Sequence, residues 1–194
     1  MHDIEPYHKW RNYYIASEDE KSPFYRREYS EFTFTNKVYN YYIHPQWDDF
    51  GSSTLYGKVL IADYTSGIAF IELIGEWNDT LYNDIMTLKN NVINPMIAQD
   101  INKYILLCDN VLNFHGDDNS YYEEWWDDIK DEGGLICFVN TMLHATQEME
   151  RSQIQYYANF GGNLEDVLWR RYLPPQVLTK VVDIINNSTK QLDY

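Results

Sequence analysis

The sequence is poor in basic residues, and it has no long apolar run. Its 194 residues include 15 lysines and arginines against 30 aspartates and glutamates, which gives a net charge of −15. Nucleic-acid binding needs clustered Lys and Arg that displace counterions from phosphates, so this composition argues against a nucleic-acid partner. It also disfavours an anionic membrane surface. No apolar run approaches the roughly 20 residues that cross a bilayer, and residues 1–10 lack a signal-peptide core, so we expect a cytoplasmic protein without a membrane partner.

Cysteine is scarce as well. The two cysteines, Cys108 and Cys137, each lie inside an apolar run, and neither CxxC nor Cys/His ligand spacing occurs. Buried free cysteine is typical of cytoplasmic proteins, although a disulfide stays open if the two runs are neighbouring strands. Phosphate-binding glycine loops, a GxSxG turn and HExxH are all missing, so no enzyme motif or cofactor is indicated.

Apolar and aromatic residues are plentiful. Hydrophobic residues make up 44% of the chain, and there are 18 Tyr, 6 Trp and 8 Phe. This content is enough for a core. A tyrosine surplus favours half-buried surfaces or an interface, with a homo-oligomer as one possible form of it.

The chain divides by pattern into an arm and one domain. Residues 1–30 alternate aromatics with charges and show no regular period, which predicts an arm packed on the domain through its aromatic side chains. Those side chains are Tyr7, Trp10, Tyr13 and Tyr14. Residues 31–194 then form a single α/β domain.

The first half of that domain has β patterns followed by a helix. Residues 32–43 are rich in aromatic and β-branched side chains with partial alternation, which predicts a strand. The runs 56–64 and 68–75 flank a short loop with Gly67, which predicts a hairpin. A helix should follow, with its N-cap at Asn78, Asp79 or Thr80. Its apolar face would be Leu81, Ile85, Leu88 and Val92, and Asn94-Pro95 would end or kink it.

The second half alternates strands and helices. The runs 103–111 and 135–140 are predicted to be buried strands joined by a helix over 120–132, which Asp117 or Asp118 would cap and Gly133-Gly134 would end. Further helices are expected at 143–158, 164–172 and 176–187. The predicted fold is therefore a mixed β-sheet flanked by helices, with the two cysteine-bearing runs side by side and the 120–132 helix as their crossover.

This order of elements resembles the STAS domain, the group typified by the anti-sigma-factor antagonist SpoIIAA. GEWND (residues 75–79) is similar to the turn that ends a strand in that family, and YILLCDNVLNFHGDDNSYY is similar to its strand and loop. The likeness covers about residues 56–160. It implies a non-enzymatic regulatory role with a protein partner. The chain also resembles members of a bacterial family with YIHPQWD, GEWND and NFHGDDSYYEEW-like segments, to which no activity is assigned.

The resemblance implies a phosphorylation candidate, Ser120. The segment 118–121 stands where the family has Asp-Ser-Ser-Gly, but Asn119 replaces the first serine and Tyr121 replaces the glycine. Residues 117–132 also hold eight acidic residues and one lysine, a local net charge of −7 that would repel the phosphates of ATP.

The segment 114–126 is the candidate working surface for a protein partner. Its acids have no EF-hand spacing, so a solvated helix face is favoured over a metal site. Tyr121, Tyr122, Trp125 and Trp126 form two helical stripes, 121–125 and 122–126, of which only one can face the sheet. The candidate binding residues are His115, Asp117, Asp118, Ser120, Tyr121, Tyr122, Trp125 and Trp126.

Two alternatives to an interaction module stay open. One is a small-molecule site lined by Tyr and Trp near Trp47, Trp77 and His115. The other is a metal- or carboxylate-dependent hydrolase, for which the candidate carboxylates near strand ends are Glu76, Asp79, Asp117 and Glu123.

Overall fold

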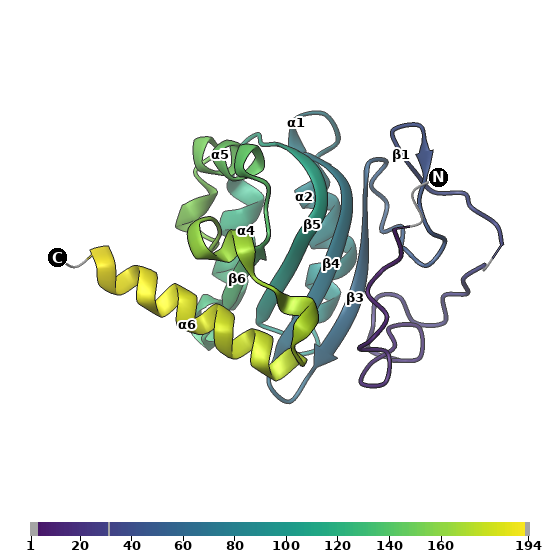
Figure 1. Ribbon diagram of the computed structural model, residues 1–194, viewed down its shortest axis with the longest axis horizontal. Helices are drawn as coiled ribbons and strands as arrows, with labels where there is room; N and C mark the ends of the chain where they lie inside the picture. Colours follow the sequence, from purple (N-terminus) through teal and green to yellow (C-terminus); the bar gives the residue numbers. More distant parts are fainter. Residues whose placement is uncertain (1–3, 31, 193–194) are drawn as a thin grey trace.

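A four-stranded mixed sheet in the order β3-β4-β5-β6 is the framework of the domain (Figure 1). The computed structural model describes the backbone of residues 4–30 and 32–192, with side chains up to residue 188. The strands are β3 (Leu55–Asp63), β4 (Ile68–Asn78), β5 (Lys103–His115) and β6 (Leu135–Val139). β3 and β4 form the predicted hairpin, while β5 and β6 add in parallel.

The crossover from β4 to β5 begins at the predicted cap. The Asn78 side chain accepts a hydrogen bond from the Leu81 backbone N–H at 2.9 Å, which satisfies an otherwise unpaired donor. The crossover is broken at Asn83, which has φ +50°, and it continues past Asn94-Pro95 because proline is tolerated in a first helical turn. Its parts are α1 (Asp79–Tyr82), α2 (Asp84–Leu88), the π-helical turn η1 (Lys89–Ile93) and α3 (Asn94–Ile97).

The crossover from β5 to β6 is the predicted aromatic helix. It comprises α4 (Ser120–Ile129) and the 3-10 turn η2 (Lys130–Glu132), and it ends at Gly133 with φ +70°. Ile105 of β5 lies opposite Cys137 of β6. The prediction that the two cysteine-bearing runs are adjacent buried strands joined by this helix is confirmed.

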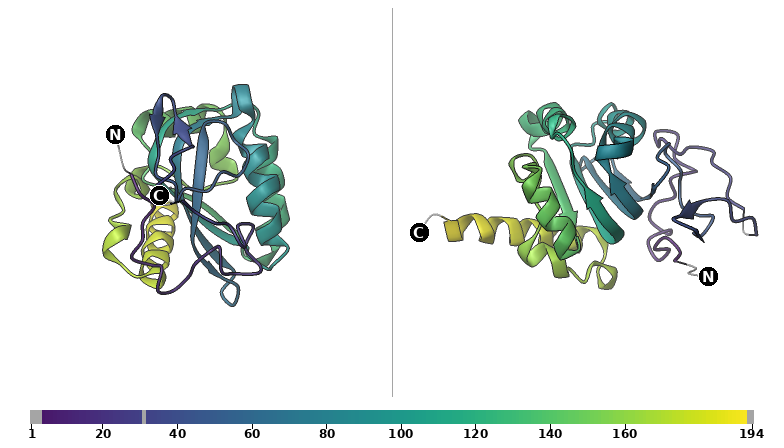
Figure 2. Two further views of the ribbon diagram at one scale, coloured as in Figure 1. Left: turned by 90° about the vertical axis from the view of Figure 1, so that its right-hand side faces the viewer. Right: turned by 90° about the horizontal axis from the view of Figure 1, so that it is seen from above.

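Both faces of the sheet are covered, as Figure 2 shows with α6 (Pro174–Leu192) on one side and the teal helices on the other. One core holds Leu88, Trp125 and Cys108, together with Met149 of α5 (Leu143–Arg151). The second core holds Trp10, Trp169, Val177 and Cys137. The two cysteines therefore face opposite sides of the sheet, and both are free thiols.

The arm contacts the second core through fewer aromatics than predicted. Trp10 is buried and Tyr7 and Tyr14 are half-buried against that core. Tyr13 is 61% exposed, so the expectation that it packs is wrong.

Residues 32–43 were expected to form a strand, and this prediction is wrong. The segment contains only a short hairpin of two two-residue strands. Its strands are β1 (Lys37–Val38) and β2 (Tyr41–Tyr42), which pair with each other and not with the main sheet. Phe32 is 88% exposed, whereas Val38 and Ile43 are buried in a small third cluster with Trp47, Tyr56 and Ile74.

The helices expected at 143–158 and 164–172 also differ. α5 stops at Arg151, and the second segment contains the 3-10 turns η4 (Gly162–Asp166) and η5 (Trp169–Arg171), with a third such turn, η3, at Ile154–Tyr156. The Asn140 side chain bonds both the N–H of Val167, at 2.8 Å, and its carbonyl, at 3.0 Å. These bonds take backbone groups that a helix would need. Within the described part of the chain, no helix is both long and apolar enough to cross a membrane.

Candidate functional site

The carboxyl ends of β4 and β5 meet at one edge of the sheet. Asn78, the last residue of β4, pairs with His115, the last residue of β5. His115 thus belongs to the strand, although the sequence placed it after the strand. Ligand sites in α/β proteins gather at such an edge because loops converge there.

The His115 side chain contacts Glu76 across this edge. Its Nε2 lies 2.9 Å from Oε1 of Glu76, with the His115 side chain 49% exposed and the Glu76 side chain 16% exposed. The neighbouring Gly75 has φ +126°, and a Cβ there would lie 2.0 Å from the Thr54 carbonyl oxygen. Only glycine therefore lets β4 approach the start of β3 so closely at the base of this pair.

The loop between β5 and α4 exposes the predicted acids and serine. Asp117, Asp118 and Ser120 are all exposed. The N-cap residue of α4 is Asn119, so the prediction of Asp117 or Asp118 at that position is wrong. Asp118 nevertheless accepts the backbone N–H of Ser120 at 2.7 Å, and hydrogen bonds from Ser120 lower its pKa.

The aromatics of α4 do not divide along the two expected stripes. Tyr122, Trp125 and Ile129 are buried, while Tyr121 and Trp126 are half-buried at the flanks. The buried residues Tyr122, Trp125 and Ile129 are spaced by three and then four positions, so the buried face contains one aromatic residue from each stripe. Tyr122 and Trp125 are therefore core residues and are not available at the surface.

A buried carboxyl, Asp79, lies beneath the edge. Its Oδ1 accepts from Trp77 Nε1 at 2.9 Å and from the Ile85 N–H at 2.9 Å, and its Oδ2 accepts from the Tyr122 hydroxyl at 2.8 Å. Burial raises the pKa of Asp79 to about 7, against the lowering effect of these hydrogen bonds. Asp79 thus joins α1 to α4 inside the core, and it does not face solvent as a catalytic carboxylate would.

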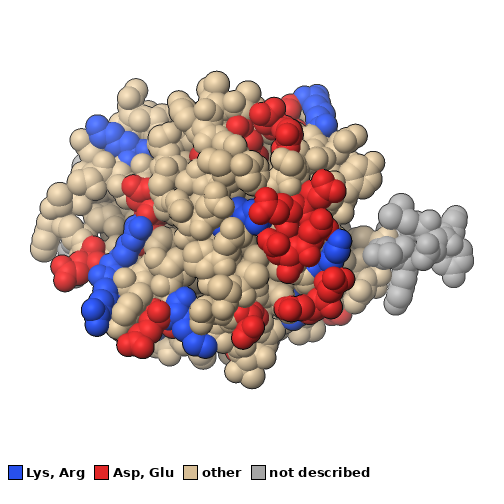
Figure 3. All heavy atoms as spheres, turned by 180° about the vertical axis from the view of Figure 1, so that it is seen from behind, with Lys and Arg blue, Asp and Glu red and all other residues tan. Residues whose placement is uncertain are grey.

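The outer face of α4 is acidic, and Figure 3 shows Asp and Glu side chains gathered on this side of the molecule. Lys89 is 1% exposed and reaches Glu124 at 2.7 Å and Asp128 at 2.8 Å, which ties η1 to α4. Asp117, Asp118 and Glu123 add further exposed negative charge. Within the described ranges, no group of three or more His, Cys, Asp or Glu side chains is placed to hold a metal ion.

Large apolar side chains are exposed beside the same edge, which the sequence did not predict. Leu81 is 72% exposed, although periodicity placed it on the buried face, because the break at Asn83 turns α1 away from α2. α5 adds Leu143, which is 64% exposed, and the next residue, His144, bonds the carbonyl of Leu112 at 2.8 Å. Leu112 is itself 40% exposed. The Thr80 hydroxyl donates to the Gly116 carbonyl at 3.0 Å, so α1 is tied to the loop from the other side.

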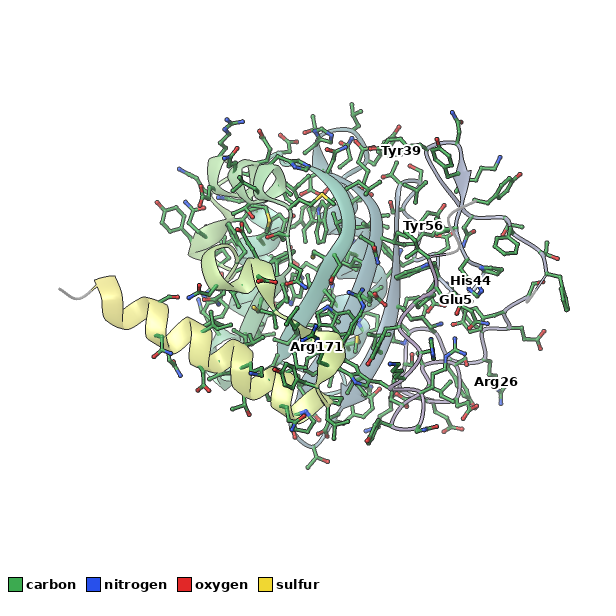
Figure 4. The ribbon with its side chains drawn as sticks, viewed as in Figure 1. Glu5, Arg26, Tyr39, His44, Tyr56 and Arg171 are labelled. Atoms are coloured by element: carbon green, nitrogen blue, oxygen red, sulfur yellow. The ribbon has the colours of Figure 1, made fainter. Side chains whose placement is uncertain are left out.

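A polar cleft of about 620 Å³ adjoins the edge. Tyr39, Tyr56 and Tyr82 line it together with Glu76 and Asn78. Figure 4 labels Tyr39 and Tyr56 where the sheet meets the N-terminal segment. The expected pocket walls Trp47 and Trp77 are each 1% exposed and belong to the core, so that part of the small-molecule prediction is wrong.

No protein-family model matches the chain, and no curated protein is similar to it at a significant level.

Proposed function

We propose that the protein is a non-enzymatic interaction module that binds a protein partner at the carboxyl edge of its sheet. We call this region the edge surface and define it by exposed residues of three segments. They are Leu81 and Tyr82, Leu112 with His115, Asp117, Asp118 and Ser120, and Met142 with Leu143. The exposure of Leu81 and Leu143 on either side of the His115 loop is the observation that supports the proposal most strongly, because large apolar side chains grouped in space mark binding sites.

The charge around this surface favours a basic partner. Asp117 and Asp118 lie within it, and Glu123 continues the negative charge along α4. Complementary charge at the rim speeds association, while apolar contacts at the centre hold the complex. We therefore expect a partner with Lys and Arg around an apolar segment. By resemblance to STAS domains, a regulatory role would follow from such binding.

Affinity capture from the native cell tests the proposal. The wild-type chain is expected to retain a specific protein that the Leu81→Ser/Leu143→Ser variant loses, and its retention should fall as salt increases. Leu173→Ser is the matched control, because Leu173 is 48% exposed but lies outside the edge surface. Equal capture by the edge variant and the wild type, at equal melting temperature, would contradict the proposal.

Ser120 remains a candidate for phosphorylation within this proposal. It is the first residue of α4 and is exposed, so a phosphate there would add negative charge to the edge surface. The intact mass of the protein from native cells is the direct measurement. A species carrying one phosphate, lost in Ser120→Ala, is the expected result, and its absence under every growth condition would count against it.

A second function, binding of a small polar molecule, is supported by the cleft beside the edge surface. Its three tyrosines and the Glu76 carboxylate are the kind of aromatic and polar groups that orient a ligand. A Tyr39→Ala variant separates the two functions, since it should weaken small-molecule binding and leave capture by the edge surface intact.

A further inference from the structure

A cavity of about 130 Å³ lies between the N-terminal arm and β3, away from the edge surface. The arm lies beside β3 (Figure 1), and two hydrogen bonds hold its first described residues. The Tyr7 N–H donates to Glu72 Oε2 at 2.7 Å, and Trp47 Nε1 donates to the Ile4 carbonyl at 2.7 Å. A cavity of roughly 150 Å³ in another protein accommodates benzene, so this space suits a ligand of about that size.

Most of the cavity wall is apolar. Ile15 and Ala16 of the arm and Val59 and Leu60 of β3 line it, together with Tyr7, Tyr14 and Tyr29. The Tyr14 hydroxyl already donates to Asp19 at 2.8 Å, and the Tyr29 hydroxyl donates to Asp48. Both hydroxyl protons are therefore engaged within the protein, and a ligand would bury mainly an apolar body here.

The polar end of the cavity carries excess positive charge. Lys58 is 12% exposed, and its Nζ lies 3.0 Å from Asp48 Oδ2 and 3.8 Å from the centre of the Tyr29 ring. Arg11 lines the same cavity and donates to the neutral Gln46 side chain at 3.1 Å. Among the described residues, no carboxylate lies within ion-pair distance of Arg11.

The electrostatic environment of Lys58 also favours an anion in this cavity. Burial lowers the pKa of Lys58, Asp48 opposes this, and repulsion from Arg11 and Arg27 adds to the lowering. An anion beside Lys58 and Arg11 would relieve that repulsion and complete the ionic contacts of both groups.

We propose that this cavity is a binding site for a small organic carboxylate. The carboxylate contacts Lys58 and Arg11, and its apolar body lies against Val59, Leu60 and Ile15. A neutral ligand would leave the positive charge unbalanced. A phosphate has no apolar body for these walls and would have to lose much of its hydration. The site is separate from the proposed partner surface, so either proposal can fail without the other.

Benzoate is the probe, with benzyl alcohol as its neutral counterpart and inorganic phosphate as the simple anion. Benzoate is expected to raise the melting temperature and to give saturable heat in calorimetry, while the other two do neither. Arg11→Gln should weaken benzoate binding by up to about fivefold, because one exposed ionic contact is lost. Lys180→Met is the control, since it removes an exposed lysine that contacts the Tyr172 ring at 4.4 Å in the way Lys58 contacts Tyr29.

Removal of Lys58 needs a compensated variant, because Lys58→Met alone leaves Asp48 buried and unpaired. Lys58→Met/Asp48→Asn removes both charges, and it should stay folded and lose benzoate binding. Three results would overturn the proposal. They are no benzoate binding up to about 20 mM, equal stabilisation by benzyl alcohol or by phosphate, and unchanged benzoate affinity in Arg11→Gln and the double variant.

Discussion

At the scale of single residues, Asp79 links stability to pH. Its pKa is raised from 3.8 to about 7, so between about pH 4 and 7 the folded chain holds a proton that the unfolded chain releases. Its contribution to stability is therefore complete below about pH 4 and is lost as the pH rises through 7. Asp79→Asn should remove this loss, which is on the order of 2–4 kcal/mol. Denaturant unfolding across this pH range checks it, with Asp118→Asn as an exposed control; an unchanged slope in Asp79→Asn would refute the assignment.

Neighbouring tryptophans of α4 are expected to behave differently. Trp125 is fully buried, so Trp125→Ala should lower the free energy of unfolding by about 3–5 kcal/mol, whereas Trp126→Ala should cost about 1 kcal/mol or less. The Trp125 indole N–H has no hydrogen-bond partner among the described residues, so Trp125→Phe should cost much less than Trp125→Ala. Urea unfolding of the three variants is the measurement. Similar losses of unfolding free energy for Trp125→Ala and Trp126→Ala would contradict the assignment of the buried face of α4.

At the scale of elements, periodicity and capping predicted what depends on local sequence. The β3–β4 hairpin, the Asn78 cap and the Gly133 stop follow from residues within a few positions of each other. The segment 164–172 was predicted as helix because its periodicity cannot reveal Asn140, more than twenty positions earlier, which binds Val167. Residues 32–43 were mispredicted for a related reason, since a β pattern does not say whether a strand of the main sheet is near enough to pair with the segment.

The position of the candidate site in the fold could be predicted from the sequence. Which of its side chains are exposed and which are buried could not. Two buried strands in parallel place His115 and the loop to Ser120 at one edge, which the alternation of strands and helices already implies. The exposure of Leu81 depends on the left-handed Asn83, and that of Leu143 depends on where α5 lies against β5. The burial of Tyr122 and Trp125 depends on how α4 rotates on the sheet. None of these follows from composition or spacing alone.

At the scale of the whole molecule, acidic and basic side chains are unevenly distributed. The acids gather along α4 and the edge surface, while Arg11, Arg27 and Lys58 lie together where the arm covers β3. The chain thus offers an acidic, partly apolar surface at one place and a small basic cavity at another. In a protein with net charge −15, this division favours different ligands at the two places.

Site-directed photo-crosslinking in native cells tests the interaction proposal most directly. A photoreactive residue at position 81 or 143 is expected to form an adduct with one and the same protein, and the same residue at position 173 is expected to form none. Adducts that appear equally from position 173, or none from positions 81 and 143, would contradict the claim that this edge of the sheet binds a partner.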